Sequence, residues 1–375
     1  MPKLEISWQN LPFVFKSSVV EKLDYIDRCS LRKCSHSDRH LVDKTPNILD
    51  VVAVNVCENY SVFAFADRPD TIITVKYFKN IGENDVRIDF YVSPRVYLPG
   101  KNKKLLYKKT KILDGVALDA DDLDFALIDF SIASKKLICN KSIINGVIIP
   151  DYCPMADPCR TMEFRERLLN LMKSFADQRS VIKSENLYLK WHQDTEEVVE
   201  ILKVFDKKIL KNLHFSDRNA TWNMSKIMET EQWRRATAVH LELLPENLKM
   251  ENLAHFREIQ MHVRDIEERE LWKLIQNFIR KNEHGASFHF TYRQAEPNLQ
   301  RILDTFDVPI KDEPIRAQTR LRSVLGSRFV HTQRFQMPFG NLVLVVMISE
   351  KEVMGTVCSA DQVDVEAKIE RGLLR

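Results

Sequence analysis

The 375-residue sequence has little of what catalytic motifs are built from. It contains only nine glycines, and none is spaced to form a phosphate-binding loop. A His-Glu-x-x-His helix and a Gly-x-Ser-x-Gly turn are both missing, which removes two common hydrolase motifs. His240-Leu241-Glu242 matches half of a zinc-deaminase pattern, but no Cys-x-x-Cys accompanies it. We therefore expect a non-enzymatic protein with no catalytic residues.

Paired cysteines are also lacking. The seven cysteines are scattered and odd in number, which argues against a secreted disulfide framework. Cys153 and Cys159 have no second Cys or His pair at zinc spacing. The acidic stretch from Asp119 to Asp124 lacks the turn glycine and terminal glutamate of a calcium loop. We expect neither a metal site nor a cofactor.

The chain has no excess of one charge and no long apolar run. Its 56 basic and 53 acidic side chains give a net charge of +3, so no nucleic-acid partner is expected. The basic run from Lys101 to Lys111 fits a nucleic-acid or import patch, but a solvated strand flank is favoured because the overall charge is near neutral. Without a membrane-length run or a signal peptide, we expect no membrane contact and a cytoplasmic or nuclear location.

What the sequence does have is an unusually apolar N-terminal segment. Phe15, Val19, Val20 and Leu23 recur at helical spacing, and Pro46 ends the helical pattern. A segment of this length buries too little surface to be stable alone. Its apolar excess therefore predicts docking, either on a partner or on the chain's own second domain.

The periodicity then changes twice. From Val51 to Val92 it is close to two, which predicts short antiparallel strands. From Phe164 onward strands and helices alternate every 20 to 30 residues or so, which favours a curved repeat; an ordinary open α/β domain is the alternative. Within it, Ile227 to Ala236 is predicted as one helix and Leu342 to Ile348 as the final buried strand.

The N-terminal residues resemble a known module. Leu11-Pro12, the helix that follows and Leu31-Arg32-Lys33-Cys34 are similar to the F-box, most closely to that of the nematode F-box A group. Val14 departs from the pattern, because many F-boxes carry an acidic residue there. Asp38 departs as well, since its position is commonly apolar or aromatic. A charge is rarely buried unpaired, so we expect Asp38 to face solvent or to be paired.

A second resemblance lies far downstream. Glu231-Gln232-Trp233 and His255-Phe256 are similar to signature residues of the FTH domain, which nematode F-box A proteins carry after the F-box. Large aromatic residues at helical spacing usually belong to a core. We therefore expect these five residues to be structural rather than contacts for a partner.

Together, periodicity and resemblance predict an α+β or α/β chain in four parts. These are an F-box (9–47), a β-rich segment (48–160), an FTH-type domain (161–348) and a C-terminal tail (349–375). The FTH-type domain is expected to form irregular strand–helix repeats that curve like a leucine-rich repeat.

The resemblance also implies a function. It implies a substrate-recognition subunit of an SCF-type (cullin-RING) E3 ubiquitin ligase, which binds a Skp-family adaptor, and through it a cullin, and holds an unidentified client on the α/β domain. The residues expected to contact the adaptor are apolar and N-terminal: Leu11, Pro12, Phe15, Val19, Val20, Leu23 and Leu31. The alternative is a protein-interaction scaffold of the same architecture that assembles no ligase.

Overall fold

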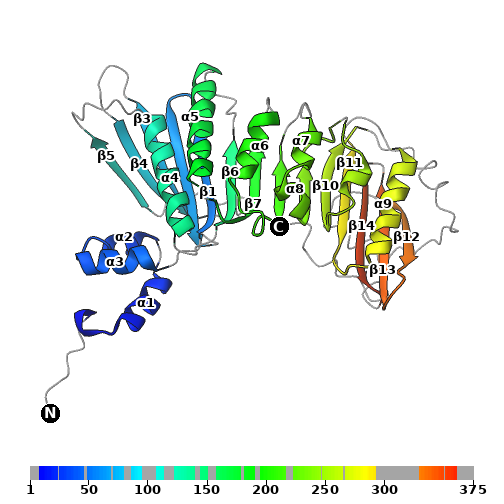
Figure 1. Ribbon diagram of the computed structural model, residues 1–375, viewed down its shortest axis with the longest axis horizontal. Helices are drawn as coiled ribbons and strands as arrows, with labels where there is room; N and C mark the ends of the chain where they lie inside the picture. Colours follow the sequence, from blue (N-terminus) through cyan, green and yellow to red (C-terminus); the bar gives the residue numbers. More distant parts are fainter. Residues whose placement is uncertain are drawn as a thin grey trace, which may run out of the picture. The chain divides into compact units, whose positions relative to one another are not determined.

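The computed structural model divides the chain into two compact units (Figure 1). The N-terminal unit comprises 1–191 and 196–210, and the C-terminal unit comprises 192–195 and 211–375. The structure describes residues 8–23, 25–45, 49–68, 71–79, 86–94, 107–113, 122–139, 144–150, 158–178, 181–190, 195–216, 223–245, 247–264, 267–292, 329–349 and 351–360. The residues beyond Ala360 lie outside these ranges.

The N-terminal unit begins with a small group of helices. A 3₁₀ turn, η1 (Trp8–Asn10), precedes α1 (Phe13–Lys22), α2 (Tyr25–Leu31) and α3 (His36–Lys44). Helices α1 and α2 both pack on α3. Pro12 directly precedes α1 in an extended conformation, where its missing N–H costs no helical hydrogen bond. The helical segment predicted from the sequence is therefore present.

The rest of this unit is a mixed sheet in the order β7-β6-β1-β2-β3-β4-β5. Its strands are β1 (Leu49–Val56), β2 (Tyr60–Arg68), β3 (Thr71–Lys79), β4 (Val86–Pro94), β5 (Tyr107–Leu113), β6 (Ile144–Pro150) and β7 (Ser184–Lys190). The antiparallel pairing from β1 to β4 confirms the short antiparallel strands predicted from Val51 to Val92, and β5 adds a further antiparallel strand. The basic run ends inside β5, while β6 and β7 continue from β1 in parallel.

Three helices belong to this sheet: α4 (Asp122–Cys139), α5 (Pro158–Asp177) and α6 (Thr195–Lys203). The sequence did not predict α4, because apolar residues lie on more than one side of it: Leu127 is buried whereas Ile128 is exposed. Helix α4 packs across β1, β2 and β3 and buries Phe130 there. The Tyr77 hydroxyl of β3 donates a hydrogen bond to Asp129 of α4, so that face of the sheet is the helix-covered one.

The C-terminal unit contains a second run of strands in the order β12-β13-β14-β11-β10-β9-β8. The strands are β8 (Asn212–Phe215), β9 (Ala238–Leu241), β10 (Glu258–Val263), β11 (Ser287–Tyr292), β12 (Phe329–Gln336), β13 (Leu342–Ser349) and β14 (Glu352–Ser359). Neighbouring strands from β8 to β11 pair in parallel. The pairs β11–β14, β14–β13 and β13–β12 are antiparallel. The connections contain α7 (Met224–Met228), α8 (Glu231–Arg235), η2 (Met250–Leu253) and α9 (Glu268–Lys281).

Two predictions for this unit were wrong. The single helix from Ile227 to Ala236 is divided into α7 and α8, because Thr230 ends one and caps the other: its hydroxyl donates to Ile227 O and accepts from the Trp233 N–H. The strand Leu342–Ile348 is not the last. Strand β14 follows it and inserts between β13 and β11, so the predicted tail from residue 349 begins with a strand.

The architecture is therefore mixed α/β with a small N-terminal helical region, as the sequence predicts. Among the residues described, no helix combines the length and the apolarity needed to span a membrane.

Close packing in the C-terminal unit gives a stability prediction. Gly355 of β14 lies opposite Phe288 of β11, and a Cβ at position 355 would overlap the buried Phe288 ring. We expect Gly355→Ala to lower the free energy of unfolding by about 1–3 kcal/mol, measured by urea denaturation. Thr356→Ala, on the half-exposed opposite face, is the control and should change it little. Equal stability of Gly355→Ala and wild type would contradict this packing.

Candidate functional site

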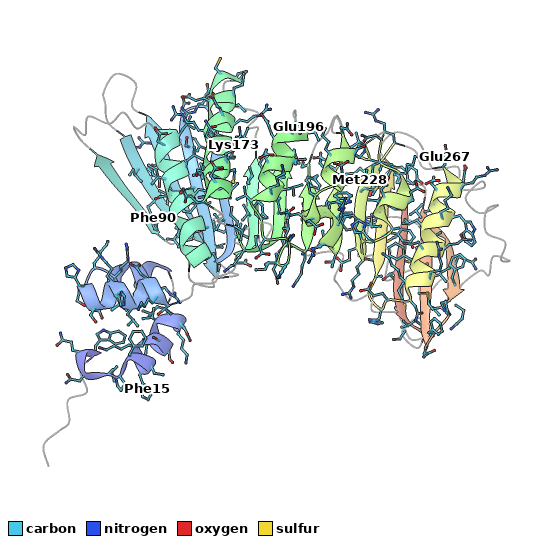
Figure 2. The ribbon with its side chains drawn as sticks, in the orientation of Figure 1. Phe15, Phe90, Lys173, Glu196, Met228 and Glu267 are labelled. Atoms are coloured by element: carbon cyan, nitrogen blue, oxygen red, sulfur yellow. The ribbon has the colours of Figure 1, made fainter. Side chains whose placement is uncertain are left out.

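Helix α1 presents an exposed apolar surface. The exposed fractions are 58% for Phe13, 73% for Val14, 64% for Phe15 and 42% for Val19. We call these four residues the α1 surface; they are half of the eight most exposed large apolar side chains in the described part of the chain. Figure 2 shows Phe15 on the outer side of the helical group. Contiguous apolar exposure of this kind is typical of protein–protein contact sites.

The predicted contact residues occupy different environments. Phe15 and Val19 belong to the α1 surface, and Pro12 beside it is also exposed. The half-buried residues, whose apolar surface is partly available, are Leu11, Leu23 and Leu31. Val20 is fully buried and packs inside the helical group. A contact between Val20 and a partner stays a prediction, and it is not part of the α1 surface.

Sequence reasoning missed Phe13 and Val14. Helical spacing selects a single stripe, here the one through Phe15 and Val19, and leaves out residues at other angles around the axis. Both missed residues lie in the first turn of α1, where no preceding turn covers them. Two apolar residues directly after a helix-starting proline were the available signal.

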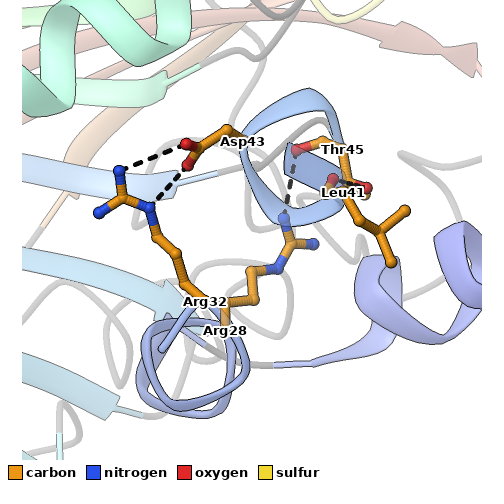
Figure 3. A network of polar contacts seen from close by, with 5 residues as sticks. All are labelled: Arg28, Arg32, Leu41, Asp43 and Thr45. Atoms are coloured by element: carbon orange, nitrogen blue, oxygen red, sulfur yellow. Dashed lines mark hydrogen bonds and ion pairs between the residues drawn. The ribbon is translucent and has the colours of Figure 1, made fainter. Parts of the chain in front are cut away.

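A buried arginine holds the helical group together. Arg28 of α2 is only 6% exposed, and its guanidinium donates to three backbone carbonyl oxygens. The acceptors are the carbonyls of Glu21 at 3.2 Å and Leu23 at 3.1 Å, at the end of α1, and of Thr45 at 3.5 Å, just after α3. Figure 3 shows the contact with Thr45. These carbonyls belong to helix C-termini, where hydrogen-bond partners are missing and the helix dipole favours a cation.

A second set of contacts fixes the end of α3. Arg32 donates to Asp43 through Nε at 2.8 Å and through Nη2 at 3.3 Å, a two-point ion pair (Figure 3). The Thr45 hydroxyl and backbone N–H both donate to Leu41 O, at 2.8 Å and 3.0 Å, and together they close the last turn of α3. The Arg32 contact joins the residue just after α2 to the last turn of α3, and the Thr45 contact joins the residue after α3 to the same turn. The helices that accompany α1 are therefore held in fixed positions.

Asp38 is paired rather than solvent-facing, which resolves the two possibilities left by the sequence. Its carboxylate accepts the Trp8 indole N–H at 2.8 Å and the Ser35 hydroxyl at 2.7 Å. Ser35 in turn accepts the Asp38 backbone N–H at 3.0 Å as the N-cap of α3. The hydrogen bonds from Trp8 and Ser35 hold the pKa of Asp38 below its ordinary value of 3.8.

The downstream signature residues lie together in the C-terminal unit. Trp233 and Phe256 are buried, with ring centroids 4.9 Å apart in an edge-on arrangement. His255 is exposed at the surface, but its Nε2 lies 3.0 Å from Trp233 O, and partial desolvation of the ring lowers the pKa of this histidine. Gln232 is buried, whereas Glu231 is half-exposed and pairs with Arg235 at 3.2 Å. Four of the five are thus tied into the packing between α8 and the loop after η2.

Nowhere in the ranges that the structure describes do three or more His, Cys, Asp or Glu side chains gather in a way that could hold a metal ion.

Comparison with known families agrees with this geometry. The model of the F-box domain matches residues 8–49, which include all three helices of the N-terminal group. The model of the FTH domain matches residues 166–310, which include Trp233 and His255. Comparison with curated proteins and with solved structures gave no match. The presence of an F-box domain followed by an FTH domain, inferred from the sequence, is confirmed.

The role of Arg28 is testable by hydrogen exchange. Arg28→Lys keeps the charge but cannot reach carbonyls at the ends of both α1 and α3. Because a hydrogen bond from a charged group contributes about 1.5–3 kcal/mol, we expect amide exchange in α1 and α3 to accelerate at least about tenfold. The conservative Arg39→Lys, on the exposed side of α3, should leave exchange unchanged. Unaltered protection in Arg28→Lys would contradict a bracing role.

Asp38 gives a pH dependence. A lowered carboxyl pKa contributes stability that is present above its unfolded value near 3.8 and is lost as the pH falls through the lower folded value. In protein labelled with ¹⁵N-tryptophan, the Trp8 indole N–H signal should therefore titrate with a midpoint below 3.8. In Asp38→Asn that titration should vanish. A midpoint above 3.8 would contradict the pairing.

Proposed function

We propose, on the premise that this chain is a protein with an F-box domain followed by an FTH domain, that it is a substrate-recognition subunit of an SCF-type ubiquitin ligase. The F-box supports a role in SCF complexes in general. In the proposed complex the helical group binds a Skp-family adaptor and through it a cullin. The protein holds a client and performs no chemistry itself, in the cytoplasm or nucleus.

The observation that carries the proposal is the α1 surface. Four apolar side chains are exposed within seven consecutive residues, from Phe13 to Val19. Burying each against a partner contributes up to about 1.5–3 kcal/mol, so a few such anchors give a specific contact. The braced helices beneath add to this, because a surface that is already ordered loses little entropy on binding.

The departure at Val14 is compatible with adaptor binding. An acidic residue at this position would place a charge at the start of α1, where the helix dipole favours it. Val14 gives up that contribution but adds exposed apolar area beside Phe13 and Phe15. The proposed contact is therefore more apolar than the usual F-box pattern.

The client is proposed to bind the α/β part of the chain. Within the C-terminal unit, the successive parallel strands with helical connections are the arrangement expected of a leucine-rich-repeat-like domain. One face of these strands carries a row of half-buried polar residues in register: His214, His240, Gln260 and His289. Polar residues on strands can provide the hydrogen bonds that a specific partner requires.

The alternative, a scaffold without ligase assembly, rested on Asp38. An unpaired charge in the third helix would have disturbed the helical group and the docking of an adaptor. Because Trp8 and Ser35 both donate to its carboxylate, Asp38 is an internal contact of the group. The observation therefore favours the ligase subunit.

Adaptor binding is the direct test. We expect the double variant Phe13→Ala, Phe15→Ala to weaken binding of a purified Skp-family adaptor at least about 100-fold by calorimetry, because two central anchors contribute on the order of 2 kcal/mol each. The folded state should be unaffected, since both side chains are exposed. Phe339→Ala, an equally exposed aromatic in the C-terminal unit, is the control.

Two outcomes would contradict the proposal. Wild-type affinity in the double variant would exclude the α1 surface as the docking site. A wild-type chain that folds but binds no Skp-family adaptor would support the scaffold instead.

A further inference from the structure

The sheet of the N-terminal unit has a basic and aromatic cluster on the face opposite α4. Strand residues alternate between faces, and Tyr77 contacts α4, so its neighbours Lys76 and Phe78 lie on the other face. The helix that packs on β2 and β3, α4, lies on the Tyr77 side of the sheet. We call the following residues the β3–β4 cluster: Tyr60, Lys76, Phe78, Arg87, Asp89 and Tyr91.

Strand pairing brings these residues together. Tyr60 lies opposite Phe78 across β2 and β3, and Phe78 lies opposite Arg87 across β3 and β4. Lys76 lies opposite Asp89 in the same register. The Tyr60 and Phe78 ring centroids are 5.1 Å apart, and the Arg87 guanidinium carbon lies 4.1 Å from the Phe78 centroid. The cluster is therefore a continuous patch across three strands.

Lys76 is the cation at its centre. Its ammonium lies 4.5 Å from the Tyr60 centroid and 5.5 Å from the Tyr91 centroid, so two aromatic rings hold it by cation–π attraction. Among the described residues no carboxylate forms an ion pair with it. The half-buried Lys76 ammonium is therefore positioned by two aromatic rings, and it can pair with an anion from outside.

Asp89, which lies opposite Lys76 in the strand register, has other partners. It is only 3% exposed, accepts the Tyr91 hydroxyl at 2.8 Å and lies 3.6 Å from Arg87 Nε. Burial and the Asp89 hydrogen bond raise the pKa of Tyr91, so its hydroxyl keeps its proton and continues to donate. Lys76 and Arg87 against Asp89 leave the cluster with a net charge of +1.

We propose that the β3–β4 cluster binds an acidic segment, rich in Asp or Glu, of the client protein. The proposal rests on the function proposed above and assigns client contact to residues 60–91, between the two matched domains. A client carboxylate pairs with the Lys76 ammonium. Val62, Ala64 and Thr74 beside it are half-buried and small, so an extended chain can lie close to the strands.

The same geometry argues against two other anionic partners. Single-stranded nucleic acid binds by stacking bases on free aromatic faces, but Lys76 and Arg87 already lie over the rings of Tyr60, Tyr91 and Phe78. A phosphorylated side chain is typically held by a two-point arginine contact, and Arg87 is engaged by Asp89 and Phe78. One point-like ammonium suits one carboxylate.

The test uses the full-length protein and a fluorescent peptide of ten glutamates, with ten glutamines as the uncharged comparison. By fluorescence anisotropy we expect the glutamate peptide to bind, the glutamine peptide not to bind, and affinity to fall as salt is raised. Lys76→Gln should weaken binding at least fivefold, and Lys76→Arg should restore most of it. Lys173→Gln removes the same charge from exposed α5 (Figure 2) and should bind like wild type.

Several results would overturn the proposal. These are unchanged binding in Lys76→Gln, equal loss in Lys173→Gln, or tighter Lys76-dependent binding of ten deoxythymidines or of a phosphoserine peptide. Adaptor binding is measured on the same variants. If a variant loses peptide binding but still binds the adaptor, the result bears on the β3–β4 cluster alone. If the wild-type protein binds the peptide but no adaptor, the ligase function is contradicted and the acidic-peptide site is not.

Discussion

The helical group depends on one buried guanidinium. Arg28 reaches the carbonyl ends of both α1 and α3, and therefore fixes the two helices relative to each other at the point where α2 joins them. A group of three short helices has little apolar interior, so polar contacts of this kind carry an unusual share of its order. The exposure of the α1 surface follows from that arrangement. Because Arg28 holds the helix ends, the apolar side chains of the α1 surface are not needed for internal packing and can contact another protein.

Asp38 and Trp8 extend the same principle to the other end of the group. The carboxylate caps the start of α3 through Ser35 and holds η1 through the Trp8 indole. A charge in this position is tolerated because both oxygens have donors. Asp38, which departs from the usual F-box pattern, therefore connects η1 with α3, the first and last elements of the group.

Periodicity predicted the elements whose apolar residues lie on one side, such as α9 and the strands β8 to β11. Periodicity did not predict elements whose apolar residues lie on more than one side. Helix α4 is apolar on more than one side, and the break at Thr230 depends on a hydrogen bond that spacing does not encode. In the candidate site, helical spacing predicted the stripe through Phe15 and Val19. It did not predict the exposure of Phe13 or the structural roles of Arg28 and Trp8. An arginine that binds backbone carbonyls leaves no partner residue in the sequence to reveal it.

The position of β14 has a consequence for how the chain folds. Strand β11 acquires its antiparallel neighbour only from residues 352–359, whereas its parallel neighbour β10 is made some 90 residues earlier. While the protein is being synthesised, β11 therefore remains an open edge until almost the whole sheet has left the ribosome. Open edges pair readily with other chains, so this interval is when the C-terminal unit is most exposed to aggregation.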